Sequence, residues 1–206
     1  MRIKVCGLKT REAVEQAAAL PIDYVGFVFA KSKRQVTAEQ ARDLLADLPR
    51  SFQAVGVFVD AAMDDLLFTA ETAGLDVLQL HGEESPAFCR ELRERSGRAV
   101  WKAWGVRGDH GDQQVAEYAD AVDAVLLDNA RGGTGQTFSW TSIPALAASL
   151  PGVPLFVAGG LHPGNVEELI SRYRPDGIDV SSGVESDGVK DPEKITDFVM
   201  RARKAQ

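Results

Sequence analysis

Short apolar runs recur eight times along the chain, and each is followed by a longer amphipathic segment. This alternation is informative because two parallel strands need a crossover of about a dozen residues or more, usually a helix. Runs of four to eight residues rich in Val, Ile, Leu and Phe are typical of buried strands. We therefore expect parallel strands at residues 2–6, 23–29, 53–59, 76–80, 99–104, 124–128, 154–158 and 177–182.

Eight strand–helix units predict an α/β fold of the (β/α)8 TIM barrel type, formed by a single domain over residues 1–206. The alternative is a doubly wound open sheet. Two observations favour the barrel: no GxGxxG motif follows the first strand, and Gln79 and Asp179 interrupt apolar runs. In a barrel, such polar side chains can point inward near the end that carries the active site.

The segments between the strands contain signals for helix starts. "TAEQ" at 37–40 is a capping box, in which the threonine and glutamine side chains satisfy amides of the first turn. Pro86, Pro163 and Pro192 are expected in first turns, where an N–H would lack a partner anyway. Between 110 and 119 the helical pattern is weak.

The chain has 23 basic and 30 acidic residues, which gives a net charge of −7. This balance argues against general affinity for nucleic acids or anionic membranes, although a local basic pocket can still bind phosphate. No apolar stretch resembles a signal peptide or approaches the length of a membrane-spanning helix. We expect a cytoplasmic protein that binds neither nucleic acid nor membrane.

The cysteines and histidines suggest neither a disulfide framework nor a metal site. Cys6 and Cys89 have no CxxC spacing, and Cys89 lies in an apolar stretch that predicts the core side of a helix. His81, His110 and His162 have no spacing typical of metal ligands. The sequence therefore predicts no metal site.

Two chemically reactive side chains are predicted at one mouth of the barrel. Cys6 ends the first strand and Asp128 ends the sixth, and strand ends build the active site in this fold. A thiol and a carboxyl there can act as a general base and a general acid. The simpler alternatives are a packed core cysteine and a carboxylate that caps a turn.

Glycine-rich segments follow the seventh and eighth strands, at Gly159, Gly160 and Gly183. Glycines at such positions let backbone amides approach an anion, and these two loops frequently bind phosphate in barrels. Ordinary turn glycines are the alternative. The segment "GGTGQT" at 132–137 lacks the lysine and spacing of a P-loop, which argues against a nucleotide site.

Two further side chains follow the second and fourth strands. Arg34 in "KSKRQV" has a planar fork suited to a carboxylate or phosphate, while a solvated charged run is the alternative. His81 in "QLHG" is expected at the same rim, in contact with a ligand or in a structural hydrogen bond.

Taken together, these segments resemble a known family. The motifs "KVCGLKT", "GFVFAKSKRQV", "LQLHGEE", "AGGLHPGNV" and "DVSSGVE" run in order through nearly the whole chain and closely resemble those of the phosphoribosylanthranilate isomerases of tryptophan biosynthesis. The resemblance implies an Amadori rearrangement, in which the aminoaldose N-(5'-phosphoribosyl)anthranilate becomes 1-(2-carboxyphenylamino)-1-deoxy-D-ribulose 5-phosphate. It implies no cofactor, because the substrate imine serves as the electron sink.

By this resemblance Cys6 matches the family's general base and Asp128 its general acid. Because a free thiol has a pKa of roughly 8.5, the site is expected to favour the thiolate. Arg34 matches the arginine that holds the anthranilate carboxylate, and segment 129–137 is expected to close over the ligand. The full set of expected substrate-binding residues is Arg34, His81, Gly159, Gly160, Asp179, Ser182 and Gly183.

Two other functions are compatible with parts of this pattern. One is the related sugar isomerase of histidine biosynthesis. Members of that family resemble one another in a pair of aspartates, and they have Asp at the place of Cys6. The other is a phosphate-binding protein or thiol redox sensor, which leaves Asp128 and Arg34 without a role. The expected partner is a phosphorylated small molecule, and the chain is expected to be a monomer or a homodimer.

Overall fold

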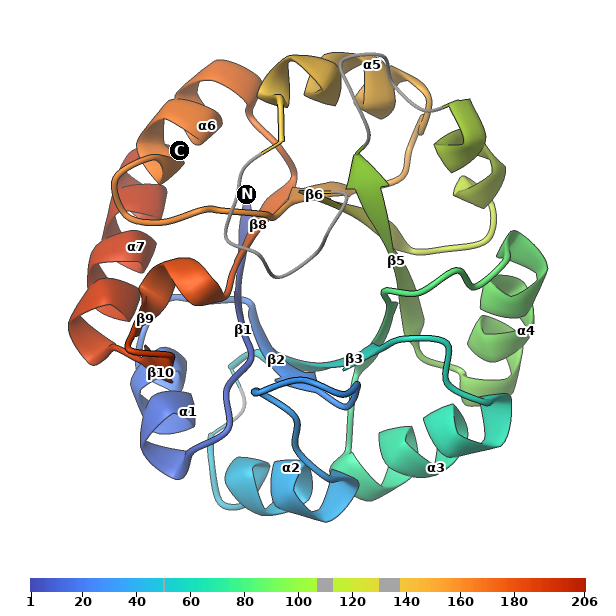
Figure 1. Cartoon of the computed structure of the whole chain (residues 1–206), viewed down its shortest axis with the longest axis horizontal. Coiled ribbons are helices and arrows are strands. Elements are labelled where there is room, and N and C mark those ends of the chain that lie inside the picture. Colours follow the sequence, from blue (N-terminus) through green and yellow to red (C-terminus); the bar gives the residue numbers. More distant parts are fainter. Residues whose placement is uncertain (50, 107–112, 130–137) are drawn as a thin grey trace.

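The computed structural model describes residues 1–206 apart from 50, 107–112 and 130–137. Eight parallel strands are hydrogen-bonded in chain order, and β1 pairs with both β2 and β8 (Figure 1). The sheet therefore closes, which confirms the predicted (β/α)8 barrel over the open sheet. The strands are β1 Arg2–Cys6, β2 Tyr24–Val28, β3 Gln53–Phe58, β4 Val77–Leu80, β5 Ala99–Val106, β6 Ala124–Asn129, β7 Leu155–Val157 and β8 Gly177–Val180.

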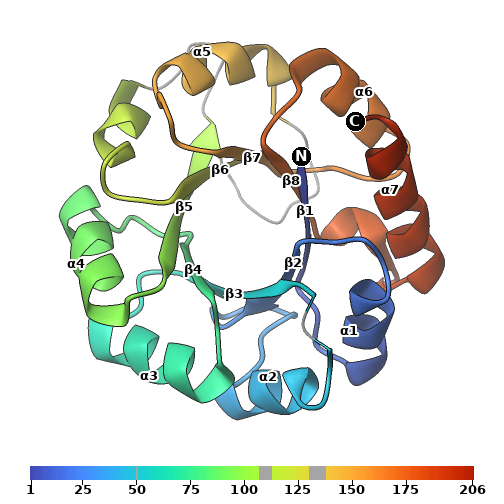
Figure 2. The ribbon, with the colours of Figure 1, turned by 180° about the vertical axis from the view of Figure 1, so that it is seen from behind.

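Helices surround this ring of strands on the outside (Figures 1 and 2). The α-helices are α1 Arg11–Ala18, α2 Ala38–Leu45, α3 Met63–Ala73, α4 Pro86–Ser96, α5 Ile143–Ala148, α6 Val166–Tyr173 and α7 Pro192–Lys204. Short 3-10 segments are η1 Gln113–Tyr118, η2 Trp140–Ser142 and η3 Ser182–Val184. After η3, strands β9 Glu185–Ser186 and β10 Val189–Lys190 form an antiparallel hairpin that the sequence did not predict. No helix in the described ranges is long and apolar enough to cross a membrane.

The helix-start signals are confirmed in part. Thr37 and Gln40 form the predicted capping box, and Pro86 and Pro192 begin α4 and α7. The prediction for Pro163 is wrong, because α6 begins only at Val166. Residues 162–165 form a turn instead, in which the Asn165 side chain accepts the His162 amide.

The weakly helical stretch at 110–119 lies partly outside the described residues. Its described end is η1, a 3-10 segment.

An aspartate precedes each even-numbered strand of the barrel and binds the strand before it. In each case Oδ2 accepts a hydrogen bond from a backbone amide near the start of the odd-numbered strand. The pairs are Asp23 with Ile3, Asp76 with Ala54, Asp123 with Val100 and Asp176 with Leu155, at 2.7–2.8 Å. We call these four contacts the aspartate staples. They join the strands two by two at the N-terminal end of the barrel.

The inside of the barrel is filled rather than hollow. The ring centroid of Trp101 lies 4.8 Å from that of Tyr24 and 4.5 Å from that of Phe156, within a buried interior cluster. A second, larger apolar cluster fills the space between strands and helices. Since side chains fill a small barrel, room for a ligand remains where the strands end.

Candidate active site

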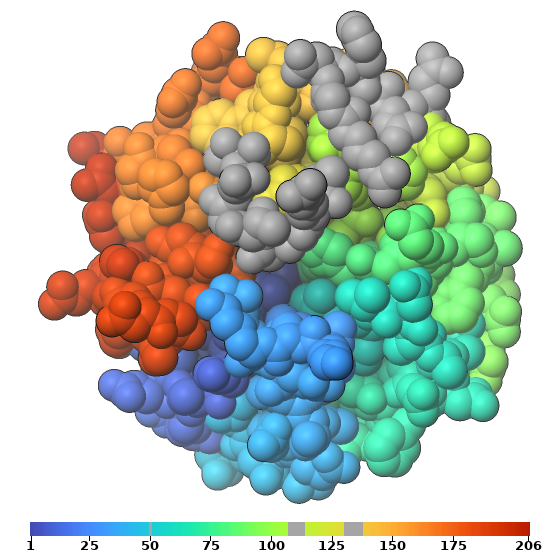
Figure 3. Space-filling view, viewed as in Figure 1, coloured from blue at the N-terminus to red at the C-terminus, as the bar shows by residue number. Residues whose placement is uncertain are grey.

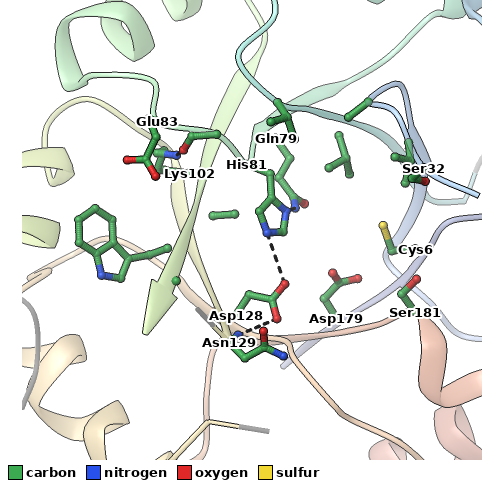
Figure 4. A pocket seen from close by; sticks show the side chains of 18 of the residues that line it. Cys6, Ser32, Gln79, His81, Glu83, Lys102, Asp128, Asn129, Asp179 and Ser181 are labelled. Carbon is green, nitrogen blue, oxygen red and sulfur yellow. Dashed lines mark hydrogen bonds and ion pairs between the residues drawn. The ribbon is translucent and has the colours of Figure 1, made fainter. Parts of the chain in front are cut away.

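A pocket of about 590 Å³ lies at the C-terminal ends of the strands. Figure 3 views the molecule from this side, and Figure 4 shows the pocket from close by. Five predicted site residues from five strand ends line it: Cys6, Arg34, His81, Asp128 and Asp179. The fold therefore brings together the thiol, the carboxyl and the arginine that the sequence singled out.

Cys6 is the last residue of β1 and is only 6% exposed. Two residues earlier, Lys4 is fully buried, with Nζ 3.1 Å from Oδ2 of Asp179. Burial raises the pKa of the Cys6 thiol, and the opposing effect of the Lys4 charge does not outweigh it. The direction of this pKa shift runs against the prediction that the site favours the thiolate.

Asp128 is held by two neighbours at the end of β6. Its Oδ1 accepts the backbone amide of Asn129 at 2.7 Å, and its Oδ2 lies 3.4 Å from Nε2 of His81 (Figure 4). His81 follows β4 and faces Asp128 across the pocket. The structure thus places the expected acid beside His81, for which the sequence predicted either a ligand contact or a structural hydrogen bond.

Gly159 packs directly against this carboxyl. Its φ is +74°, and a Cβ there would lie 2.7 Å from Oδ1 of Asp128 and 2.9 Å from the amide of Asn129. Both the backbone conformation and the space therefore require glycine. One glycine predicted for phosphate binding also makes room for the predicted acid.

The four residues predicted to bind phosphate lie beside the pocket. Gly159 and Gly160 follow β7, while Ser182 and Gly183 lie in η3 after β8. A Cβ on Gly183 would overlap the carbonyl of Leu161, so the two loops touch through backbone. The described lining of the 590 Å³ pocket includes the neighbouring Ser181 and none of these four. Their role in binding phosphate stays a prediction.

Arg34 has a partner that the sequence interpretation missed. Its Nε donates to Oε1 of Glu185 at 2.6 Å, and its Nη2 donates to Oε2 at 2.9 Å. Its stem crosses Gly7, where a Cβ would lie 2.5 Å from Cδ of Arg34. The glycine after the cysteine therefore lets the arginine lie beside Cys6. Glu185 gave no periodic signal, since it belongs to a two-residue strand.

A second missed group holds the segment that carries His81. Lys102 is 2% exposed and donates to the Gly82 carbonyl at 2.5 Å and to Oε2 of Glu84 at 3.0 Å. Glu84 also accepts the amides of Asp60 and Gly82. The lysine inside the apolar run "AVWKAW" is the sequence signal that points to this network.

The structure also bears on Cys89, on metal binding and on the segment after β6 that was expected to cover the ligand. Cys89 is fully buried in α4, as predicted, and both cysteines are free. In the part of the chain that the structure describes, no group of three or more His, Cys, Asp and Glu side chains is arranged to hold a metal ion. The segment 129–137, expected to cover the ligand, lies outside the described residues from 130 onward.

Comparison with known proteins agrees with the fold and identifies the family. The family model for N-(5'phosphoribosyl)anthranilate (PRA) isomerase matches residues 3–201. The N-(5'-phosphoribosyl)anthranilate isomerase of Brevibacillus brevis is 47% identical over 207 residues, covering 98% of this chain and 93% of that protein.

Solved structures give the same result. The phosphoribosyl anthranilate isomerase of Thermus thermophilus matches with a TM-score of 0.89 and 35% identity over the whole of both chains. A phosphoribosyl anthranilate isomerase in complex with reduced 1-(o-carboxyphenylamino)-1-deoxyribulose 5-phosphate matches with a TM-score of 0.87 and 35% identity over 99% of both chains. With the family model matching nearly its full length, the chain belongs to the N-(5'-phosphoribosyl)anthranilate isomerase family.

Proposed function

We propose that the chain catalyses the Amadori rearrangement of N-(5'-phosphoribosyl)anthranilate with Cys6 as general base and Asp128 as general acid. The observation that carries the proposal is the meeting of a buried thiol and a buried carboxyl in one pocket, from β1 and β6. Such a pair suits a reaction that protonates one atom and deprotonates another nearby. The substrate follows from the family, one member of which is solved with a reduced carboxyphenylamino-deoxyribulose phosphate.

The reaction begins with Asp128. In its protonated form Asp128 donates to the furanose ring oxygen, and the ring opens to a Schiff base. Cys6 then removes the proton from C2', which gives an enolamine. Protonation at C1' and loss of the hydroxyl proton complete the ketose, so atoms balance without a cofactor. His81 and the Asn129 amide hold the Asp128 carboxyl in place for the first step.

Proton abstraction requires the thiolate, whereas burial favours the thiol. Lys4 lies on the same face of β1 as Cys6, and its charge lowers the pKa of Cys6 against the effect of burial. Lys4 is therefore suited to stabilise the thiolate as it forms.

Substrate binding divides among three groups in this proposal. Arg34 holds the anthranilate carboxylate, and backbone amides at 159–160 and 182–183 hold the phosphate. Asp179 accepts a hydrogen bond from a ribose hydroxyl. In support of this, its buried Oδ1 has no hydrogen-bond partner among the residues that the structure describes.

The proposal is tested by turnover. Purified protein is mixed with N-(5'-phosphoribosyl)anthranilate, and the loss of substrate fluorescence is followed without added metal or cofactor. We expect turnover with this substrate and none with the aminoaldose of histidine biosynthesis. Binding without turnover by the well-folded protein would instead support a phosphate-binding protein.

A further inference from the structure

We propose that Glu185 is a positioning residue that holds Arg34 so that one edge of the guanidinium faces the substrate's carboxylate. This inference rests on the proposed function, in which Arg34 binds that carboxylate. The carboxylate of Glu185 comes from the β9–β10 hairpin, while Arg34 comes from the loop after β2. The two residues are 151 positions apart in the chain.

The geometry of the pair leaves half of the fork available. A guanidinium offers two edges to planar anions, the Nε/Nη2 side and the Nη1/Nη2 end. Glu185 takes the first edge through hydrogen bonds of 2.6 and 2.9 Å. Within the described ranges, Nη1 has no hydrogen bond, and Arg34 lines the pocket. The end-on edge therefore remains for a second carboxylate.

Glu185 is itself fixed from the other side. Lys190 of β10 donates to its Oε1 at 2.9 Å and to the carbonyl of Ser181 at 2.8 Å. Although burial alone raises the pKa of Glu185, the hydrogen bonds from Arg34 and Lys190 hold it at about 2. The carboxylate therefore stays ionised at any pH at which the enzyme would work.

Glu185 does not neutralise the site that it organises. Lys33, whose Nζ lies 3.7 Å from Oε2, joins Arg34 and Lys190 around this one carboxylate. Three cations against one anion leave a local charge of +2, which still attracts an anionic ligand.

The test compares two ligands that differ only in the carboxylate. One is reduced 1-(2-carboxyphenylamino)-1-deoxyribulose 5-phosphate, and the other is the phenylamino compound without the carboxyl group. Calorimetry gives the ratio of their dissociation constants for the wild type, Glu185→Gln, Arg34→Met and the double variant. Glu71→Gln is a control for the loss of one arginine-paired carboxylate elsewhere, because Glu71 pairs with Arg98 at 2.9 Å and neither residue is in the described lining of the pocket.

We expect Glu185→Gln to raise the dissociation constant of the carboxylated ligand on the order of ten- to a hundredfold. The dissociation constant of the other ligand should stay nearly unchanged. In the Arg34→Met background, Glu185→Gln should have no further effect on the ratio. Glu71→Gln should match the wild type. Should Glu185→Gln not fold, Glu185→Asp is the second variant. Its shorter side chain keeps the charge but removes the paired hydrogen bonds to Arg34, and we expect the same change in the ratio of dissociation constants.

Other outcomes overturn the inference. Tighter binding of the carboxylated ligand by Glu185→Gln would mean that Glu185 competes for Arg34, and an unchanged ratio in a well-folded variant would mean a structural contact only. If Arg34→Met keeps the wild-type ratio of the two dissociation constants, the assignment of Arg34 in the proposed function fails, independently of Glu185.

Discussion

Cys6 and Lys4 share one face of β1, and the charge of the lysine lowers the pKa of the thiol against the larger effect of burial. Lys4 is fully buried and pairs with Asp179, so removing Lys4 leaves a carboxylate buried without its partner. Loss of one member of a buried pair typically costs about 3–5 kcal/mol of folding free energy. Lys4 therefore affects both the pKa of Cys6 and the folding free energy, the latter through its pair with Asp179.

Replacing the proposed base tests the mechanism most directly. We expect Cys6→Ala to fold, because alanine is small and Cys6 lies at the pocket, but to lose about 10²- to 10⁴-fold in kcat. Asp128→Asn should behave likewise, since the amide keeps the shape but donates no acidic proton. Steady-state kinetics together with melting curves measure both effects. Near-normal kcat in a well-folded Cys6→Ala would make Cys6 a core residue.

The raised pKa of Cys6 predicts slow alkylation at neutral pH. The charged groups that act on the thiol are Lys4, Asp179 and Lys190, with burial as the main effect. Since the pKa lies above its usual value, the thiolate and its reaction with iodoacetamide should appear only as pH rises above about 8.5.

Lys4→Met should shift this alkylation profile to still higher pH, because it removes the charge that favours the thiolate. The Cys89→Ala background leaves a single thiol to follow. Lys4→Met/Asp179→Asn removes both charges of the pair and so controls for the buried unpaired carboxylate. An unshifted profile in both variants would show that Lys4 does not act on Cys6.

At the scale of elements, the end of β6 and the segment after β7 depend on one another through Gly159. Gly159→Ala should cost about 1–2 kcal/mol from its positive φ and should also displace Asp128, so that kcat falls. Gly152→Ala is a matched control, because Gly152 has φ +80° with no atom within 4 Å of an added Cβ. Thermal melts and kinetics separate the two effects. Equal kcat in both variants would contradict the role of Gly159.

The elements also show what the sequence could and could not reveal. Strand positions were predictable to within two residues, because a run of apolar residues is a local feature of the sequence and indicates a buried strand. The β9–β10 hairpin was not, since its two-residue strands are held by contacts between Glu185, Arg34 and Lys190. The start of α6 was misplaced because Asn165, rather than Pro163, makes the turn before that helix.

At the scale of the whole molecule, the strand ends bring five predicted site residues to one pocket. Their convergence was predictable because the barrel gives all strand ends one face. The protonation of Cys6 was not, because it depends on how deeply the closed barrel buries the thiol. Whether the chain is a monomer or a homodimer stays a prediction.

The aspartate staples have a consequence for how the chain can be divided. A break after Gly97 leaves each of the four contacts inside one fragment, whereas a break after Gly74 separates Asp76 from Ala54. Both glycines are left-handed caps at the ends of helices, so the two breaks disturb similar local structure. We expect co-expressed fragments 1–97 and 98–206 to recover more isomerase activity than 1–74 and 75–206. Equal recovery would show that the staples do not define separable halves. If the expectation holds, each pair of strands joined by an aspartate staple is a structural unit, and the chain can be divided between these units without loss of the barrel.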